Sequence, residues 1–340
     1  MKAIKALIPA AILLGTAGAA LAQSSVTVYG RLNESVERQK TDDDSVTRLQ
    51  NNGSRIGFRG VEDLGGGLKA GFTLEHRLNA DTGAATNNGL NGTANAFWGG
   101  AGESSVFLSG AFGQIKAGHY TSEAYFATSD VTDLLNHGTG TSSDALYKYL
   151  GTDNNKVSYR TPALGPVTAE LGVILGEGTA NRTYDLAVNA TFGALGLGLG
   201  YEKVNDDILT PAAIGTAGDS QLAIRASYSM SPFTVTGYVQ RYKNDSIDKS
   251  KTIARVSGQF DIGALELHAA VGTAGQIDGA GSGALGEDEG KARQYTVGVN
   301  YNLSKRTKVF AFYNQTKFNA VDLTPETKFS AASVGVRHNF

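Results

Sequence analysis

The feature that most constrains the fold of this chain is a period-two alternation of apolar and polar residues, which recurs to the last residue. In residues 294–303, tyrosine, valine and leucine occupy every odd position, and glutamine, threonine, glycine and asparagine occupy the even positions. Residues 184–192 and 221–230 repeat the pattern. Alternation over about ten residues predicts a β-strand with one apolar and one polar face. The chain is therefore predicted to be all-β.

Short and long connections alternate along the chain between these predicted strands. The short turns are residues 63–67, 111–113, 163–166, 192–194, 231–232, 261–263 and 303–306. Examples of the long, polar connections are residues 39–51, 79–100, 121–154, 205–218 and 275–291. Short turns at one rim and long loops at the other are typical of a transmembrane β-barrel. Seven turns and eight loops predict a 16-stranded antiparallel transmembrane β-barrel with short periplasmic turns and long external loops.

The sheet is expected to close into a barrel because its outer surface faces lipid. Backbone N–H and C=O groups that face lipid have no water partner, so an open sheet edge is excluded. With about sixteen strands, the lumen holds water instead of packed side chains. The alternative is a soluble β-sandwich, whose inner faces must be apolar. The second face here is glutamine, asparagine, serine, threonine and charge in strand after strand, which favours the barrel.

The first residues have the three regions of a secretory signal peptide. Lys2 and Lys5 are basic, residues 4–14 are mostly apolar, and residues 20–22 form an Ala-x-Ala cleavage site. We expect residues 1–22 to be removed after Sec export, which leaves 23–340 as a single barrel domain. Removal changes the formal charge from −2 to −4, so nucleic acid is not an expected partner. The chain has no cysteine, so it relies on neither disulfides nor thiolate-bound metal.

The last strand carries a further signal. Val336, His338 and the C-terminal Phe340 lie on one face of an alternating strand that begins near Ala332. A terminal aromatic residue on such a strand is the feature that outer-membrane assembly machinery recognises. We therefore expect these three residues to form the assembly signal.

Several motifs together resemble a known family. They are QSSVTVYG at residues 23–30, SRIGFRGVEDLGGGLKA at residues 54–70, NLSKRT at residues 302–307 and GVRHNF at residues 335–340. The chain resembles the general porins of Gram-negative bacteria, and within them the neisserial and betaproteobacterial trimeric porins, over essentially the whole mature length. The resemblance implies sixteen strands, a homotrimer in the outer membrane among lipid and lipopolysaccharide, and a third loop folded into the lumen. It also implies passive passage of ions and small hydrophilic solutes.

Alternation assigns the charged side chains of the first strands to the lumen, because an arginine or lysine that faces lipid at the midplane costs about 2–4 kcal/mol. The predicted constriction wall consists of Arg31, Arg55, Arg59, Lys69, Arg77 and Lys116, with His119 at the end of the fifth strand. A wall of this kind favours anions, so weak anion selectivity is expected.

The third long loop, residues 121–154, carries the acids Glu123, Asp130 and Asp133 before its first basic residue, Lys148. If this loop folds inward, its acids face the basic wall and set a transverse field across the constriction. The arginines could equally serve to pair with these acids and tether the loop. The sequence leaves both interpretations open.

Two positions depart from many relatives, which have arginine where this chain has Glu103 and His119. Both changes remove positive charge, and His119 could make conductance depend on pH. The sign and strength of selectivity therefore stay open, as do the pore radius and the physiological solute. The five histidines have no metal-ligand spacing, and no cofactor is expected.

Two other functions compete with an open channel. An enzyme on a barrel needs a hydrolytic constellation, and Glu266 beside His268 on one strand is the nearest approach. An adhesin or phage receptor would use the long loops, but it needs no polar inward face on nearly every strand. The glycine-rich residues 193–200 lack the helix and lysine of a phosphate loop; they suit a subunit contact or a lipid face equally well.

Overall fold

The computed structural model describes residues 25–85, 102–137, 145–150, 154–178, 181–205, 217–277, 290–319 and 327–340. The predicted signal peptide, residues 1–22, lies outside these ranges. Of the helices in the described residues, none has the length and apolar character needed to cross a membrane.

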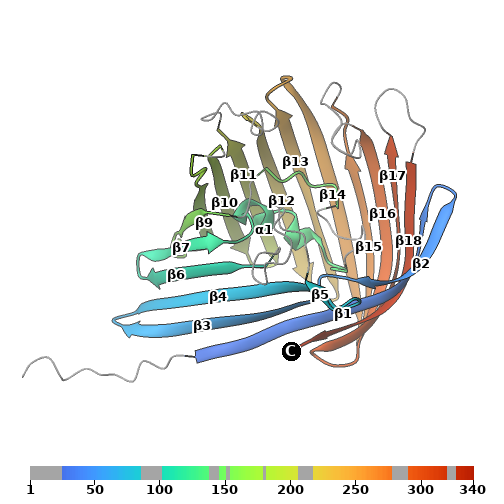
Figure 1. The fold of residues 1–340 in the computed structure, drawn as a ribbon, viewed down its shortest axis with the longest axis horizontal. Helices are drawn as coiled ribbons and strands as arrows, with labels where there is room; N and C mark the ends of the chain where they lie inside the picture. The colour runs from blue at the N-terminus through green and yellow to red at the C-terminus, as the bar shows by residue number, and fades with distance from the viewer. Residues whose placement is uncertain are drawn as a thin grey trace, which may run out of the picture.

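The described chain is almost entirely antiparallel β-sheet (Figure 1). The strands of the first half are β1 (Ser25–Thr41), β2 (Asp44–Asn51), β3 (Arg55–Gly65), β4 (Leu68–Asn79), β5 (Ala84–Ala85), β6 (Ser104–Gly110), β7 (Gly113–His119), β8 (Lys156–Arg160) and β9 (Val167–Ile174). Those of the second half are β10 (Thr183–Phe192), β11 (Leu195–Val204), β12 (Ser220–Met230), β13 (Phe233–Asn244), β14 (Lys249–Ile262), β15 (Leu265–Ala274), β16 (Lys291–Asn302), β17 (Thr307–Asn319) and β18 (Thr327–Asn339).

These segments form a closed barrel of sixteen strands, as the sequence predicts. The upper half of β1 pairs with β2 and the lower half with β3, so β2 and β3 together make one strand of the wall. The two-residue β5 pairs only with the end of β4. Closure is made by β1 and β18, whose register runs from Arg31 opposite Asn339 to Thr41 opposite Phe329. Gly30 and Phe340 add two backbone hydrogen bonds of 3.0 and 3.1 Å.

The predicted facing of side chains is present along the strands. On β1, Val28, Leu32 and Val36 are exposed on the outer surface, whereas Arg31 and Asn33 are buried on the inner side. The outer surface therefore carries the apolar side chains that lipid requires, and the polar side chains line the interior.

Residues 39–51 differ from the expected long loop. β1 continues to Thr41 and β2 begins at Asp44, so only Asp42 and Asp43 form the turn. Asp42 adopts a φ of 51°, which aspartate tolerates better than most residues. Outside the membrane, water solvates polar side chains on both faces of a hairpin. The backbone pairing of β1 with β2 can therefore continue through a segment that is polar throughout. The connection after β13 is also short, residues 245–248.

The described parts of loop 3, residues 121–137 and 145–150, fold into the barrel, as the resemblance implied (Figure 1). They contain the short helix α1 (Glu123–Ala127) and the 3₁₀ turn η1 (Asp130–Thr132). α1 contacts β10 and β11, and η1 contacts β13 and β14. The loop therefore lies along the inner side of β10–β18 and leaves the inner side of β1–β7 facing the lumen.

Candidate pore constriction

The wall opposite loop 3 carries three arginines in one row. Arg31 on β1 lies directly opposite Arg55 on β3, and Arg55 lies directly opposite Arg77 on β4. We call these three residues the arginine row. Like charges in direct cross-strand register destabilise a sheet. Three arginines in direct register therefore lower the stability of this sheet, which indicates that they serve a purpose other than stabilising it.

One carboxylate relieves part of this repulsion. Glu75 Oε1 lies 3.3 Å from Arg55 Nη1 and 3.0 Å from Arg77 Nε. The Tyr29 hydroxyl donates to the other oxygen of Glu75 at 3.2 Å. Glu75 is buried beneath the arginines, so its charge is set back from the water while both guanidinium groups remain partly exposed. The row keeps a net positive charge.

The other predicted wall residues extend this surface toward the short-turn rim and along β7. The Arg59 guanidinium lies over the Tyr29 ring at 5.1 Å, and Lys69 lies on β4 opposite Asp63 near the β3–β4 turn. Lys116 forms an ion pair with Glu103 at 2.8 Å and lies 4.1 Å above the Tyr120 ring. Glu103 therefore offsets a specific wall cation, Lys116.

His119, the second departure from the family pattern, lies at the end of β7 with Nδ1 2.6 Å from Oδ1 of Asn154. This contact joins the two ends of loop 3, because residue 119 precedes the loop and Asn154 ends it. The structure thus places His119 at the root of the loop and away from the arginine row on β1–β4.

The far end of the described part of loop 3 meets the arginine row. Asn136 Oδ1 accepts from Arg31 Nη1 at 3.4 Å, and its backbone oxygen accepts from Arg337 Nη1 at 3.3 Å. Asn136 has a φ of 52°, a conformation that asparagine adopts more readily than most residues. Arg31 also donates twice to the backbone oxygen of Gly53, at 3.2 and 3.3 Å. The tether is thus made by neutral oxygens, and Arg31 keeps its charge.

The root of loop 3 is held by a glycine surface on β11. A Cβ atom on Gly198 would lie 1.9 Å from the backbone oxygen of Ala127, and one on Gly200 would lie 2.5 Å from that of Ala124. Only glycine lets α1 approach the strand this closely. The glycine-rich segment was predicted to serve a subunit contact or a lipid face; at these two positions it instead faces the lumen and receives α1.

Charged groups on β8 and β10 fix the same helix. The Asp185 carboxylate accepts from the backbone N–H of Glu123 at 2.9 Å and of Ala124 at 3.0 Å. Lys156 Nζ lies 2.5 Å from Asp185 and both side chains are buried. A buried pair is tolerated where every charge has such partners. These residues were absent from the predicted site, because nothing local in β8 or β10 marks them as partners of a distant loop.

Glu123 is turned toward β8 and not toward the arginine row. Its Oε2 lies 3.2 Å from Arg160 Nη2, and Arg160 Nε lies 2.7 Å from Glu170. Burial, with the nearby Glu170 carboxylate, raises the pKa of Glu123 to about 7 against the pull of Arg160, Lys156 and Lys116. The expectation that all three loop acids face the basic wall therefore does not hold for Glu123.

The other two predicted acids have different environments. Asp133 Oδ1 accepts from the backbone N–H of Asn136 at 3.0 Å and so shapes the turn that presents Asn136. Asp130 is exposed at the start of η1. Of the three loop acids, Asp130 is the most exposed.

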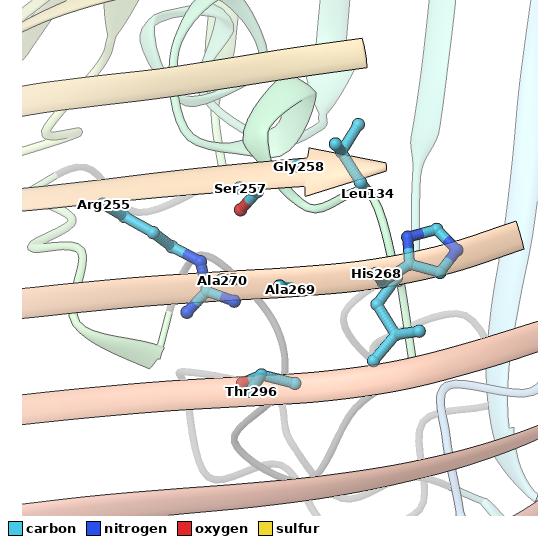
Figure 2. A pocket seen from close by; sticks show the side chains of 9 residues that line it. Leu134, Arg255, Ser257, Gly258, His268, Ala269, Ala270 and Thr296 are labelled. Carbon is cyan, nitrogen blue, oxygen red and sulfur yellow. The ribbon is translucent and has the colours of Figure 1, made fainter. Parts of the chain in front are cut away.

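Between these ends the loop packs tightly on the wall. Leu135 lies in an apolar cluster with Phe310, Phe312 and Ala331. Figure 2 shows Leu134 beside Arg255, Ser257, His268 and Thr296, and the cavity between loop and wall is about 10 Å³, the size of one water molecule. No passage for solutes runs behind this part of the loop.

A buried histidine, His137, anchors this part of the loop. The His137 ring stacks on Phe310 with centroids 3.6 Å apart, and its Nε2 lies 2.8 Å from Asn300 Oδ1. Nδ1 lies 3.4 Å from the side-chain nitrogen of Asn33. Burial lowers the pKa of His137 to about 3, so the ring is neutral and can donate at one nitrogen and accept at the other.

The returning arm of loop 3 is held by side-chain amides. Gln240 binds both backbone groups of Lys148, at 2.9 Å from the N–H and 2.8 Å from the oxygen. The Tyr147 hydroxyl accepts from Gln221 Nε2 at 3.1 Å, and the Tyr147 ring packs edge-on against Tyr238. The polar residues of β12 and β13 are thus used to hold the loop.

The Glu266 and His268 pair belongs to a network in the wall. Glu266 accepts from Lys308 at 3.1 Å, from Asn300 at 2.8 Å and from Asn302 at 2.6 Å, and His268 Nε2 lies 3.5 Å away. A carboxylate occupied by three donors holds the wall together and leaves little freedom to orient a catalytic base.

The C-terminal residues predicted as an assembly signal lie on the outer surface. Val336 and Phe340 are exposed there, and His338 Nδ1 lies 2.8 Å from the Thr307 hydroxyl. The Phe340 ring covers Gly30, where a Cβ atom would lie 2.4 Å from the ring. The last residue therefore completes the joint between β18 and β1.

Comparisons with known proteins agree with this geometry. The model of the Gram-negative porin family matches residues 9–320. Outer membrane porin protein 32 of Delftia acidovorans is 30% identical over 384 residues, which cover 99% of each chain. Major outer membrane protein P.IB of Neisseria lactamica is 25% identical and covers 94% of this chain and 95% of its own. A solved structure described as an anion-selective porin from Comamonas acidovorans has a TM-score of 0.74 and 25% identity, with 94% of this chain and 100% of that chain covered.

A closed sixteen-stranded barrel with an inward loop opposite a charged wall defines a diffusion channel of the outer membrane. The chain belongs to the Gram-negative porin family, which confirms the resemblance seen in the sequence. It is an outer-membrane general diffusion porin, and its relatives are channels and not enzymes.

Proposed function

We propose that this porin is weakly anion-selective and that the arginine row carries the preference. The single observation behind the proposal is the direct register of Arg31, Arg55 and Arg77 with the Glu75 carboxylate set among them. Fixed cations beside water in a narrow, low-dielectric passage raise the local concentration of anions. The solved relative described as anion-selective supports the same sign.

The preference is weak because carboxylates accompany the cations. Glu75 and Glu103 offset part of the wall, and Asp130 is exposed on loop 3. Arg31 serves both purposes considered above. It holds loop 3 through the neutral side-chain oxygen of Asn136, and it keeps the charge that contributes to the field in the lumen.

The test is a planar bilayer recording with a tenfold KCl gradient, in which the reversal potential is read. The expected result is a potential of the anion sign that falls toward zero in Arg31→Gln and Arg77→Gln. A cation-sign potential for the unaltered protein would contradict the proposal and assign dominance to Asp130 and the wall carboxylates. Lys243→Gln, at an exposed position near the external turn after β13, is the control and should leave the potential unchanged.

We also propose a homotrimer in which the face around β1, β2 and β18 contacts a neighbouring subunit. Glu34 lies between Leu32 and Val36 on the outer face and borders an apolar groove of about 600 Å³ lined by Leu49, Tyr301 and Val334, among others. A carboxylate on a lipid-facing surface is unfavourable. Conductance steps in multiples of three, and loss of the trimer band on heating, are the expected observations.

Two processing steps complete the proposal. Residues 1–22 are removed during Sec export, so N-terminal sequencing of the mature protein should begin at Gln23. The barrel-assembly machinery recognises Val336, His338 and Phe340, so deletion of Phe340 should lower the amount of folded protein in the outer membrane. The finished barrel lies among lipid and lipopolysaccharide and passes small ions and hydrophilic solutes.

A further inference from the structure

Aromatic side chains are exposed on the part of loop 3 that borders the lumen. Phe126 is 42% exposed and Tyr149 is 37% exposed, and both belong to a loop enclosed by the barrel (Figure 1). The exposed apolar side chains of the strands lie instead on the outer surface, where lipid covers them. Apolar area facing a water-filled passage is unfavourable unless a solute covers it, so these rings call for an explanation.

The two exposed rings belong to one ordered cluster. Tyr125 lies between them, with its ring centroid 5.6 Å from that of Phe126 and 4.9 Å from that of Tyr149. Beneath them Tyr147 contacts both Tyr125 and Tyr149, at 5.7 and 5.4 Å, and is itself buried against Tyr238. We call Tyr125, Phe126 and Tyr149 the aromatic platform.

The platform is fixed before any solute arrives. The loop beneath it is held by Gln240 at Lys148, by Asp185 at α1 and by the glycine surface of β11. A rigid surface loses little conformational entropy when it binds, so even a small contact area contributes to affinity. The anchoring of loop 3 is already supplied by these contacts and by the buried Tyr147, and it does not need the exposed face of Phe126.

The basic wall lies across the same passage. The described part of loop 3 contacts the inner side of β10, β11, β13 and β14, and its Asn136 contacts Arg31 of the arginine row. We infer that the platform and the row border the same lumen. Aromatic rings prefer to stack on flat rings, and arginine binds carboxylates through two parallel hydrogen bonds. A solute with a flat ring at one end and a carboxylate at the other satisfies both surfaces.

We propose that the constriction is a binding site for aromatic carboxylates, whose ring stacks on the aromatic platform while the carboxylate meets the arginine row. This rests on the proposed anion-selective pore and names a solute class for it. Such a site is transient, because a channel must release what it binds.

The experiment adds sodium benzoate to one side of a bilayer that holds the native trimer in KCl, and it measures the decrease in single-channel current. Benzoate is expected to reduce the current saturably. Acetate, which has the charge without the ring, and benzamide, which has the ring without the charge, are expected to do so only at much higher concentration. Saturable reduction by acetate or benzamide at the same concentrations as benzoate would overturn the proposal.

Phe126→Leu and Tyr149→Leu keep apolar volume and remove a ring. Each should weaken the apparent affinity for benzoate about two- to tenfold, the factor that one aromatic contact provides. The matched control is Phe112→Leu, because Phe112 is also 42% exposed but lies in the short turn between β6 and β7. Equal benzoate affinity in Phe126→Leu, Tyr149→Leu and the native protein would overturn the proposal.

The same recordings separate this failure from failure of the proposed function. The reversal potential in KCl alone reports anion preference, and benzoate affinity reports the platform. An anion-sign potential without a benzoate effect overturns only the aromatic site. A cation-sign potential overturns the selectivity proposal itself.

Discussion

The two sides of the lumen are built on different principles, although both are made of strands with the same alternation. On β1–β7 the inward side chains include cations that lie beside water, such as Arg55 and Arg77, with the buried Glu75 set behind them. On β10–β18 the inward side chains are occupied in holding loop 3, as Asp185 and Gln240 do. One side carries charge and the other carries the loop that narrows the passage.

This difference shows what an inward polar residue costs and provides. Like charges in register on β1, β3 and β4 work against the sheet, so their gain lies in the field they set. Asp185 and Gln240 on β10 and β13 bind the backbone of loop 3, so they gain stability by defining one position for it. Substitutions on the first side should therefore change selectivity, and substitutions on the second should change pore size.

The largest effect is expected at the surface that receives α1. In Gly200→Ala the new Cβ atom would overlap the backbone of Ala124, and Gly198→Ala would overlap Ala127 more severely. Overpacking of this kind costs about 1–3 kcal/mol, so the root of loop 3 should move away from β11 into the lumen and the conductance in KCl should fall. Gly258→Ala is the control, because its Cβ would lie 3.9 Å from the nearest atom. Unchanged conductance in both β11 variants would contradict the assigned role of the glycines.

The second effect concerns the carboxylate beside the arginine row. Its removal should shift the reversal potential in the direction opposite to the shift caused by removal of an arginine. Glu75→Gln removes the carboxylate that Arg55 and Arg77 share, so the reversal potential should shift further in the anion direction. The sheet should become less stable, by about 0.2–1 kcal/mol for each newly repelling pair. Glu103→Gln should produce a smaller shift of the same sign, since Glu103 offsets Lys116 alone. A shift in the cation direction for either variant would show that the row does not control selectivity.

The third effect is a dependence on pH. With a pKa of about 7, Glu123 is largely protonated at pH 6 and charged at pH 8. Because this pKa lies above the ordinary value of 4.5, Glu123 keeps its proton in the folded state at pH values where it has lost it in the unfolded state. The stability contributed by the protonated form is therefore lost as pH rises through 7. Anion preference should therefore increase as pH falls from 8 to 6, because protonation of the buried Glu123 removes one negative charge from the loop that borders the lumen.

Two variants identify the group responsible for this pH dependence. Glu123→Gln should abolish the change in reversal potential between pH 8 and pH 6. His119→Gln should leave the change intact. If the second variant removes the change and the first does not, His119 and not Glu123 is the sensor.

The strands and the basic wall could be predicted from the sequence because the rules that govern them are local. Alternation and the cost of charge in lipid fix which way Arg31, Arg55 and Arg77 point without knowledge of the rest of the chain. The path of loop 3 could not be predicted, because it depends on pairs far apart in sequence. Gly198 and Ala127, or Asp185 and Glu123, acquire meaning only when β10 and β11 lie beside the loop.

The contrast between local rules and long-range pairing also explains two differences between the sequence-based predictions and the structure. The sequence groups Glu123 with Asp130 and Asp133 because all three are loop acids, but in the structure Glu123 pairs with Arg160 on β8. Residues 39–51 are polar and were therefore assigned to a loop, yet the register with β1 continues to Thr41. Composition indicates where a segment meets water, and pairing decides whether it is a strand.

The smallest effect is expected at the short-turn rim of the basic wall. Lys69 lies opposite Asp63 beside the β3–β4 turn and is exposed, whereas Arg31 is buried within the narrow part. Dissolved salt screens an exposed charge over about 8 Å at physiological ionic strength and about 3 Å in 1 M salt. Lys69→Gln should therefore shift the reversal potential much less than Arg31→Gln, and its shift should vanish in concentrated KCl while that of Arg31→Gln persists. An effect of Lys69→Gln that equals the effect of Arg31→Gln in concentrated salt would mean that selectivity is set at the rim and not at the arginine row.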